Sequence, residues 1–466
     1  MRKTPNYNPA EHTPRLEDAF MTRREALQRT GMGMGALSLA WLLGQTTTAR
    51  ANAVTILSPL APKQPQFPTK AKHVIHIFAG GGPSHVDTWD PKPALSKYAD
   101  QTLPGLNGLA YPSPFEFKKM GKSGVEVSEL FPQLGACVDD MCVIRSMWTD
   151  VPAHEPASKF MHTGSLQIPK PSLGSWLVYG LGTENQNMPG FISLGGKPEY
   201  RQASFLPSLY QGVNVNYSTK LPLNQVLLNI HNQFTSSDDQ RLQLDLARRL
   251  NTMHAEKLHK EEQLEARIES FEMAFRMQTE ATDAFDIMKE SPEMRQAYGN
   301  TEFGAKLLVA RRLVERGVRF VQVFTGGWDH HANLEVSLRK KATEIDQPAA
   351  TLIADLKKRG LLDDTLIIWG GEFGRTPMGQ GTGRDHHILA FSLWLAGGGI
   401  KPGITYGATD ELGYKSVDKV VTMHDLHATM LRLCGIDHER FSVKFQGLDA
   451  RLSGVEPARI VKDILA

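Results

Sequence analysis

Residues 370–387 combine side chains suited to metal and oxyanion chemistry in one polar, glycine-rich stretch. The segment reads GGEFGRTPMGQGTGRDHH and contains Glu372, Arg375, Arg384, Asp385, His386 and His387. Its six glycines and its proline argue against a regular helix or strand. Apolar runs flank it at residues 365–369 and 391–396, so we expect a loop between two buried strands. Loops of this kind carry ligand-binding and catalytic groups in α/β proteins.

Three further apolar runs lead into segments in which histidine lies close to a carboxylate. The runs are residues 73–79, 141–144 and 318–324, and the segments after them contain His85, Asp87, His154, Glu155, Asp329, His330 and His331. The carboxyl ends of parallel strands lie along one edge of a sheet. We therefore expect all four segments to converge on one site.

Imidazole together with carboxylate suits Zn²⁺, Mn²⁺ or Fe, whereas Ca²⁺ prefers oxygen alone. In each His-His pair we expect one ring to face the site and the other to point elsewhere. The candidate metal ligands are His85, Asp87, Asp329, His331, Glu372, His386 and His387. We expect a divalent metal ion, with zinc as the first choice and manganese, iron or calcium as alternatives.

Arg375 and Arg384 allow two interpretations. Their guanidinium groups suit a clamp on sulfate or phosphate through forked, charge-assisted hydrogen bonds. They equally suit structural ion pairs with Glu372 or Asp385. The sequence leaves both open.

The N-terminal 53 residues have the organisation of an export signal. Arg23-Arg24 precedes an uncharged stretch at residues 30–43, and the small-x-small site Ala51-Asn52-Ala53 follows. The paired arginines and the weakly apolar, glycine-rich stretch indicate twin-arginine export, so we expect a periplasmic or extracellular protein and the twin-arginine machinery as a partner. The uncharged stretch is shorter than the roughly 20 residues of a membrane span.

Composition places the rest of the chain among ordinary globular proteins. The chain has 466 residues, 41% of them hydrophobic and 22% charged, with a net charge of +2. Such a balance provides no basic face of the kind that nucleic-acid binding needs. Three cysteines, Cys137, Cys142 and Cys434, lie in apolar surroundings and are interpreted as buried small residues.

The periodicity predicts an α/β fold with a central, mainly parallel sheet flanked by helices. Helices are expected at residues 303–316, 337–359 and 424–434, and strands at 191–194, 366–369 and 391–396, besides the three runs above. Residues 236–300 are charged, poor in glycine and helical in period, so we expect a helical insertion there. The predicted organisation is a signal peptide (1–53), an extended linker (54–71), and one α/β domain (72–235 and 301–466) interrupted by the insertion.

Four separated motifs resemble one known family in its own order. They are GGGPSHVDTWDPKP (80–93), PSLGSWLVYGLGTENQNMPGF (171–191), GGWDHHAN (326–333) and GEFGRTP with GRDHH (371–387). The family is the exported, sulfatase-like domain of unknown function 1501, in the alkaline phosphatase superfamily. The resemblance covers about residues 72–452 and implies an alkaline phosphatase-like α/β fold with a metal centre at the strand ends.

Carried over residue by residue, the resemblance implies an order of ligands along the chain. Asp87 is the first acid, Asp329 with His331 is an Asp…His pair, and Glu372 replaces a later Asp. His386 or His387 is the last ligand. This chain departs from the superfamily in two steps here, because its Asp…His pair is unusually close and its Asp-His step reads Glu372-Phe373.

The nucleophile position is the third departure. Sulfatases carry C/S-x-P-x-R shortly before a Thr-Gly, whereas this chain has His154-Glu155-Pro156-Ala157-Ser158 before Thr163-Gly164. Formylglycine chemistry is therefore not expected. His154 remains a candidate ligand, general base or covalent nucleophile.

Two functions fit these patterns. The first is a metal-dependent hydrolase of anionic esters, sulfate or phosphate, whose substrate class includes sulfated polysaccharides. The second is a non-catalytic protein of the same fold that binds a polysaccharide or an oxyanion. The loss of the usual nucleophile favours the second, and the retained acid and imidazole groups favour the first.

Overall fold

The computed structural model describes residues 58–103, 105–166, 169–227, 236–258, 271–273, 275–276 and 281–466. The predicted export signal, with Arg23-Arg24 and residues 51–53, lies outside the described residues. So do residues 54–57 of the predicted linker and several parts of the predicted helical insertion. Among the helices of the described ranges, none has the length and apolarity needed to cross a membrane.

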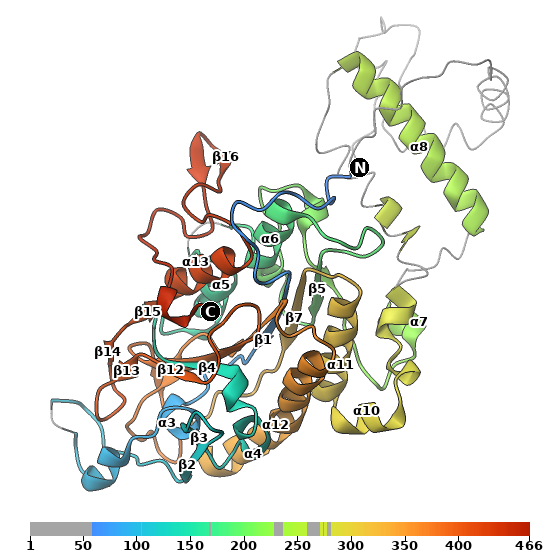
Figure 1. Cartoon of the computed structure of the whole chain (residues 1–466). Helices are drawn as coiled ribbons and strands as arrows, with labels where there is room; N and C mark the ends of the chain where they lie inside the picture. The colour runs from blue at the N-terminus through green and yellow to red at the C-terminus, as the bar shows by residue number, and fades with distance from the viewer. Residues whose placement is uncertain are drawn as a thin grey trace, which may run out of the picture. The chain divides into compact units, whose positions relative to one another are not determined.

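One nine-stranded sheet organises the described chain (Figure 1), in the order β12-β4-β11-β8-β1-β7-β5-β6, with β15 paired to β4. The strands are β1 (His73–Phe78), β4 (Met141–Trp148), β5 (Phe191–Leu194), β6 (Val213–Asn214), β7 (Phe320–Phe324), β8 (Thr365–Gly370), β11 (Phe391–Ala396), β12 (Ile404–Tyr406) and β15 (Val421–Thr422). Strand β1 pairs in parallel with β7 and β8, while β11 runs antiparallel to both β8 and β4. Strands β1, β4, β7 and β8 therefore run in one direction and end at the same edge.

Helices cover both faces of this sheet because its strands are apolar on both sides. In β1, Ile75 and Ile77 pack in one core with residues of α11 (Glu302–Glu315) and α12 (Leu334–Lys358). Val74 and Phe78 pack in a second core with residues of α5 (His154–Thr163), α6 (Leu173–Leu181) and α13 (Met423–Leu433). The predicted α/β class, with a mainly parallel sheet between helices, is confirmed.

Smaller elements complete the described chain. They are α3 (His85–Thr88), β2 (Phe117–Met120), β3 (Val125–Ser128), α4 (Pro132–Gly135), α7 (Leu223–Val226), α8 (Ser237–Leu258), α10 (Pro292–Ala297), β9 (Gly374–Arg375), β10 (His386–His387), β13 (Ala408–Thr409), β14 (Ser416–Asp418), β16 (Val443–Phe445), β17 (Leu448–Ala450) and 3₁₀ turns at Pro93–Tyr98, Val138–Asp140, Pro198–Tyr200, Ser208–Tyr210, Ile287–Lys289 and Lys462–Ile464. The predicted burial of Cys142 and Cys434 is confirmed, and Cys137 is half-buried.

Two local predictions about irregular segments are wrong. Residues 154–163 were expected in a loop but form helix α5, capped at its C-terminus by Gly164 with φ 62°. Pro156 resembles a turn signal in sequence, yet the first turn of a helix tolerates proline because those N–H groups have no helical partner. Within residues 370–387, β9 and β10 form a short antiparallel pair that places His386 opposite Arg375.

The predicted linker is extended but lies against the domain where it is described. Backbone N–H groups of Lys63, Gln66 and Lys70 donate to carbonyl groups at the ends of α6 and α13. Leu60 is buried. The segment thereby ties the start of the described chain to the helices on one face of the sheet.

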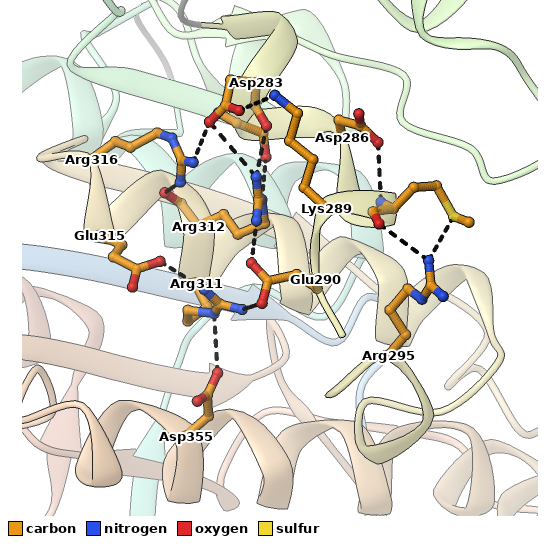
Figure 2. Close-up of polar contacts among 12 residues, drawn as sticks. Asp283, Asp286, Lys289, Glu290, Arg295, Arg311, Arg312, Glu315, Arg316 and Asp355 are labelled. Atoms are coloured by element: carbon orange, nitrogen blue, oxygen red, sulfur yellow. Dashed lines mark hydrogen bonds and ion pairs between the residues drawn. The ribbon is translucent and has the colours of Figure 1, made fainter. Parts of the chain in front are cut away.

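A network of ion pairs joins the segment before α10 to α11 and α12 (Figure 2). Arg311, only 1% exposed, lies 2.8 Å from Glu290, 2.7 Å from Glu315 and 3.0 Å from Asp355. Its three carboxylate partners come from three different elements of the chain. The network therefore holds these elements together on the face of the sheet that α11 and α12 cover.

Candidate metal centre

Polar side chains from three strand ends meet at the common carboxyl edge of the sheet. His154 follows β4 as the first residue of α5, and Asp329 and His331 follow β7. Glu372 and His386 come from the long loop between β8 and β11. The convergence follows from strand direction, as the sequence predicted, since β4, β7 and β8 all end here.

Three imidazoles surround one carboxylate oxygen, Oδ1 of Asp329. The Nε2 atoms of His331, His154 and His386 lie 2.9, 3.3 and 3.5 Å from it. Two of these nitrogens, Nε2 of His331 and Nε2 of His386, lie 3.0 Å apart. One ring of each predicted His-His pair thus belongs to the cluster.

The opposite nitrogen of each ring lies beside an oxygen that accepts a hydrogen bond. The pairs are His154 Nδ1 with Glu372 Oε1 at 2.6 Å, His386 Nδ1 with Pro152 O at 2.8 Å, and His331 Nδ1 with Gln380 Oε1. Carboxylate and carbonyl oxygens only accept, so each Nδ1 carries the hydrogen. The Nε2 atom of each ring therefore lies on the side of the Asp329 carboxylate, and that of His331 also lies 3.3 Å from Arg375 Nη1.

Burial and charge act in opposite directions on these groups. Burial raises the pKa of Asp329, but the hydrogen bond and charge of Arg375 outweigh it and lower that pKa to about 2. Burial lowers the pKa of His154, but the hydrogen bond that it donates to Glu372 and the charges of Glu372 and Asp329 raise it above its ordinary value. For His386, burial prevails and the pKa falls. The cluster concentrates negative charge on Asp329 and Glu372.

Arg375 is fully buried and uses its donors within the protein. Its Nε donates to Gly82 O at 3.0 Å and Nη1 donates to Arg384 O at 3.1 Å. Nη2 donates to Gly81 O and to Asp329 Oδ1. Of the two interpretations of Arg375, this geometry favours structural support of Asp329 over an oxyanion clamp.

Arg384 forms a buried ion pair with Asp87, and both side chains are 0% exposed. Two hydrogen bonds of 2.7 and 3.0 Å join the guanidinium to the two carboxylate oxygens, and Ser84 Oγ donates to the same carboxylate at 2.5 Å. The guanidinium also lies 4.7 Å from the ring centroid of Tyr111. The structure thus places Asp87, an expected metal ligand, outside the imidazole cluster, and it gives Arg384, an expected anion clamp, no exposure to solvent.

His85 and His387 also lie outside the cluster. His85 Nε2 lies 2.8 Å from Gly413 O, and His387 Nε2 contacts Tyr414 O. The two rings stack with centroids 6.2 Å apart. Burial lowers the pKa of His387 to about 4. Both rings therefore hold the loop at residues 410–415 in this structure, although the sequence made them candidate ligands.

The donor set nevertheless fits a metal ion. His154 Nε2, Asp329 and His386 Nε2 form a group whose ligand atoms lie within 4.8 Å of one another. Two atoms bound to zinc in tetrahedral geometry lie about 3.3 Å apart, which matches the 3.3 and 3.5 Å distances to Asp329 Oδ1. His154 Nε2 is shielded from solvent and makes no well-directed hydrogen bond, although Asp329 Oδ1 lies 3.3 Å away. A cation placed between His154 Nε2, Asp329 and His386 Nε2 would be bound by all three groups.

A second group, His331 with Asp385 and His386, shares one residue with the first. An Nε2 atom binds one ion at a time, and His386 Nδ1 is engaged by Pro152 O. The two groups therefore offer alternative positions for one ion. Gln380 and the Pro152 carbonyl were not singled out in the sequence, because an amide and a main-chain oxygen carry no signal there.

The fold and the cluster define an α/β protein with an acid–imidazole site at the carboxyl edge of a mainly parallel sheet. A family model described as "Protein of unknown function (DUF1501)" matches residues 71–465. The chain belongs to this family, so the resemblance seen in its four motifs is confirmed.

Solved structures match the chain at low identity and low TM-score. The PsFucS1 sulfatase from Pseudoalteromonas sp. is 12% identical, with a TM-score of 0.33, over 79% of this chain and 69% of that one. The lipoteichoic acid synthase LtaP from Listeria monocytogenes is 9% identical, with a TM-score of 0.38, over 85% and 78%. The periplasmic domain of EptC from Escherichia coli, in complex with Zn, is 10% identical, with a TM-score of 0.36, over 81% and 86%. No curated protein matches the sequence.

Proposed function

We propose that the chain is a metal-dependent hydrolase of anionic esters, sulfate or phosphate, that acts in the periplasm or outside the cell. The observation that supports this is the convergence of three imidazole Nε2 atoms on Asp329 Oδ1. His154, Asp329 and His386 would hold one divalent metal ion, with zinc as the first choice for this nitrogen-rich set. The fourth position would remain for substrate or water.

A metal ion bound there would lower the pKa of a coordinated water to about 7 and polarise an ester oxygen. His331 lies at the edge of this set, with its side chain 38% exposed and its Nε2 2.9 Å from Asp329. Its Nδ1 is held by Gln380, while its Nε2 lies 3.3 Å from Arg375 Nη1 and 3.0 Å from His386 Nε2. Nε2 would exchange these contacts when it accepts a proton from an incoming nucleophile. We assign His331 to proton transfer and His154 to metal binding instead of nucleophilic attack.

The start of α5 supports binding of an anionic group. Helix α5 begins at His154, and its cap residue Ala153 provides no side-chain acceptor for the first N–H groups. The positive end of a helix dipole favours an anion at this position. Since Arg375 and Arg384 are occupied, the metal and this helix end would bind the oxyanion. The proposed substrates include the sulfate esters of sulfated polysaccharides. Export through the twin-arginine pathway is also part of the proposal.

Protein purified with its native metal tests this proposal by metal content and by hydrolysis of aryl sulfate and aryl phosphate. We expect one metal ion per chain and turnover of at least one ester, both lost in His154→Ala and His386→Ala. His424→Ala is the matched control, because His424 is a half-buried histidine on α13 that contacts Gly164 O. Bound metal without turnover of either ester would favour the non-catalytic binding protein and overturn the hydrolase.

A further inference from the structure

We infer that Glu372 is a positioning residue for His154 and that it does not bind the metal itself. This inference rests on the proposed function, in which His154 is a ligand. Glu372 is 1% exposed and accepts the Nδ1 hydrogen of His154 at 2.6 Å. Ligating histidines commonly donate their other ring N–H to a carboxylate, which fixes the tautomer and the ring orientation.

The hydrogen bonds of Glu372 engage chiefly its Oε1 atom, on the side of the His154 ring away from the proposed ion. Oε1 accepts from both His154 Nδ1 and Gly81 N, the latter at 3.0 Å, and Oε2 accepts from Gly81 N at 3.3 Å. Asp329 lies at the opposite nitrogen of the same ring, 3.3 Å from Nε2. The imidazole of His154 therefore separates Glu372 from the proposed ion.

Gly81 permits this arrangement through its backbone. Its φ is +116°, and a Cβ at this position would lie 2.6 Å from the backbone nitrogen of Asp329. Only glycine adopts this conformation at so close an approach without strain. The same residue thus brings an N–H to Glu372 and lets the Asp329 backbone lie alongside.

Phe373 packs against two of the proposed ligand rings. Its ring centroid lies 4.8 Å from that of His154 and 4.8 Å from that of His386. Glu372 supplies a hydrogen-bond acceptor for His154, and Phe373 supplies an apolar contact for His154 and His386. This dipeptide is the step at which the chain departs from the Asp-His expected from the resemblance. Its two side chains orient ligands, and neither needs to be a ligand.

The first test measures the His154 tautomer in metal-free protein by ¹⁵N NMR with labelled histidine. In the wild type we expect the hydrogen on Nδ1. Glu372→Ala should release this preference, and Glu372→Gln, which retains an acceptor oxygen, should preserve it. An unchanged tautomer in Glu372→Ala would overturn the inference. This measurement involves neither metal nor turnover, so it decides the inference even if no ester is hydrolysed.

The second test titrates Zn²⁺ and Co²⁺ into the same variants. Loss of an outer partner of this kind weakens metal affinity about 10–100-fold, so we expect that range for Glu372→Ala with one ion still bound. The Co²⁺ absorption spectrum should keep its shape, and Glu372→Gln should lie closer to the wild type. If Glu372→Ala abolished binding, or altered the Co²⁺ spectrum as Asp329→Ala does, Glu372 would be a ligand and the inference would be wrong. If the Glu372→Ala protein fails to fold, metal affinity and the Co²⁺ spectrum are compared between Glu372→Gln and the wild type.

Discussion

Replacement of Asp87 by alanine separates a structural role from a metal-binding role. Asp87 and Arg384 are both 0% exposed and are joined by two charge-assisted hydrogen bonds of 2.7 and 3.0 Å. Asp87→Ala would leave the Arg384 guanidinium buried without its counter-charge. We therefore expect a loss of folding stability and a normal metal content.

The size of the effect follows from the burial of the pair. Removing one partner of a buried ion pair costs about 3–5 kcal/mol. For the unit Ser58–Ala466, an unfolding entropy of about 2.1 cal/mol/K per residue sums to about 0.9 kcal/mol/K. The unfolding temperature should therefore fall by about 3–6 °C.

Calorimetry with and without a chelator, alongside metal analysis, measures both quantities. The matched control is the double variant Asp87→Leu with Arg384→Met, which replaces the pair by apolar side chains of similar size. Such exchanges are often neutral or stabilising, so the double variant should recover most of the lost stability. An Asp87→Ala protein with an unchanged unfolding temperature and no metal would refute the reasoning and restore Asp87 as a ligand.

Two further predictions concern stability away from the metal centre. Burial lowers the pKa of both His162 and His427 to about 3, below about 6.5 for an unfolded chain. The unfolded state then binds more protons between these values, so stability should be lost as pH falls from about 6.5 towards 3, by at most about 1.4 kcal/mol per pH unit for each group. Urea unfolding at pH 7 and pH 5 checks this, and a His162→Phe variant with the same pH dependence would contradict it. Asp355→Ala should reduce the unfolding free energy by about 1.5–3 kcal/mol, because it removes one charged partner of the buried Arg311 while Glu290 and Glu315 remain. An unchanged urea midpoint would show that the contact with Asp355 contributes nothing.

Strand direction explains why segments far apart in the sequence could be expected at one edge of the sheet. Apolar runs of the length and composition of β1, β7 and β8 identify buried strands, and alternation of strands with helices is typical of parallel connections. The loops after these strands must then end at one edge, whatever the strand order. For the same reason, Asp329 and His386 could be placed in one site although they lie far apart along the chain.

The roles of individual residues were harder to predict because they depend on distances that no spacing specifies. Asp87 and Arg384 have the residue types of a ligand and an anion clamp, yet they neutralise each other at 2.7 Å. Helix α5 was missed because Pro156, in the first turn of the helix, has the appearance of a turn residue. The pairing of β9 with β10 within the long loop could not be predicted from the sequence either. This pairing places His386 opposite Arg375.

The histidine pairs show how a local rule decides which residue joins the site. Adjacent residues of an extended segment direct their side chains to opposite sides, so His386 and His387 cannot both face Asp329. His386 Nε2 lies 3.5 Å from Asp329 Oδ1, while His387 contacts Tyr414 O on the other side. The register of β10 selects between them, because a shift by one residue would exchange the two rings. A two-residue strand therefore decides which histidine is the proposed ligand, and the neighbouring histidine anchors that strand to the loop at residues 410–415.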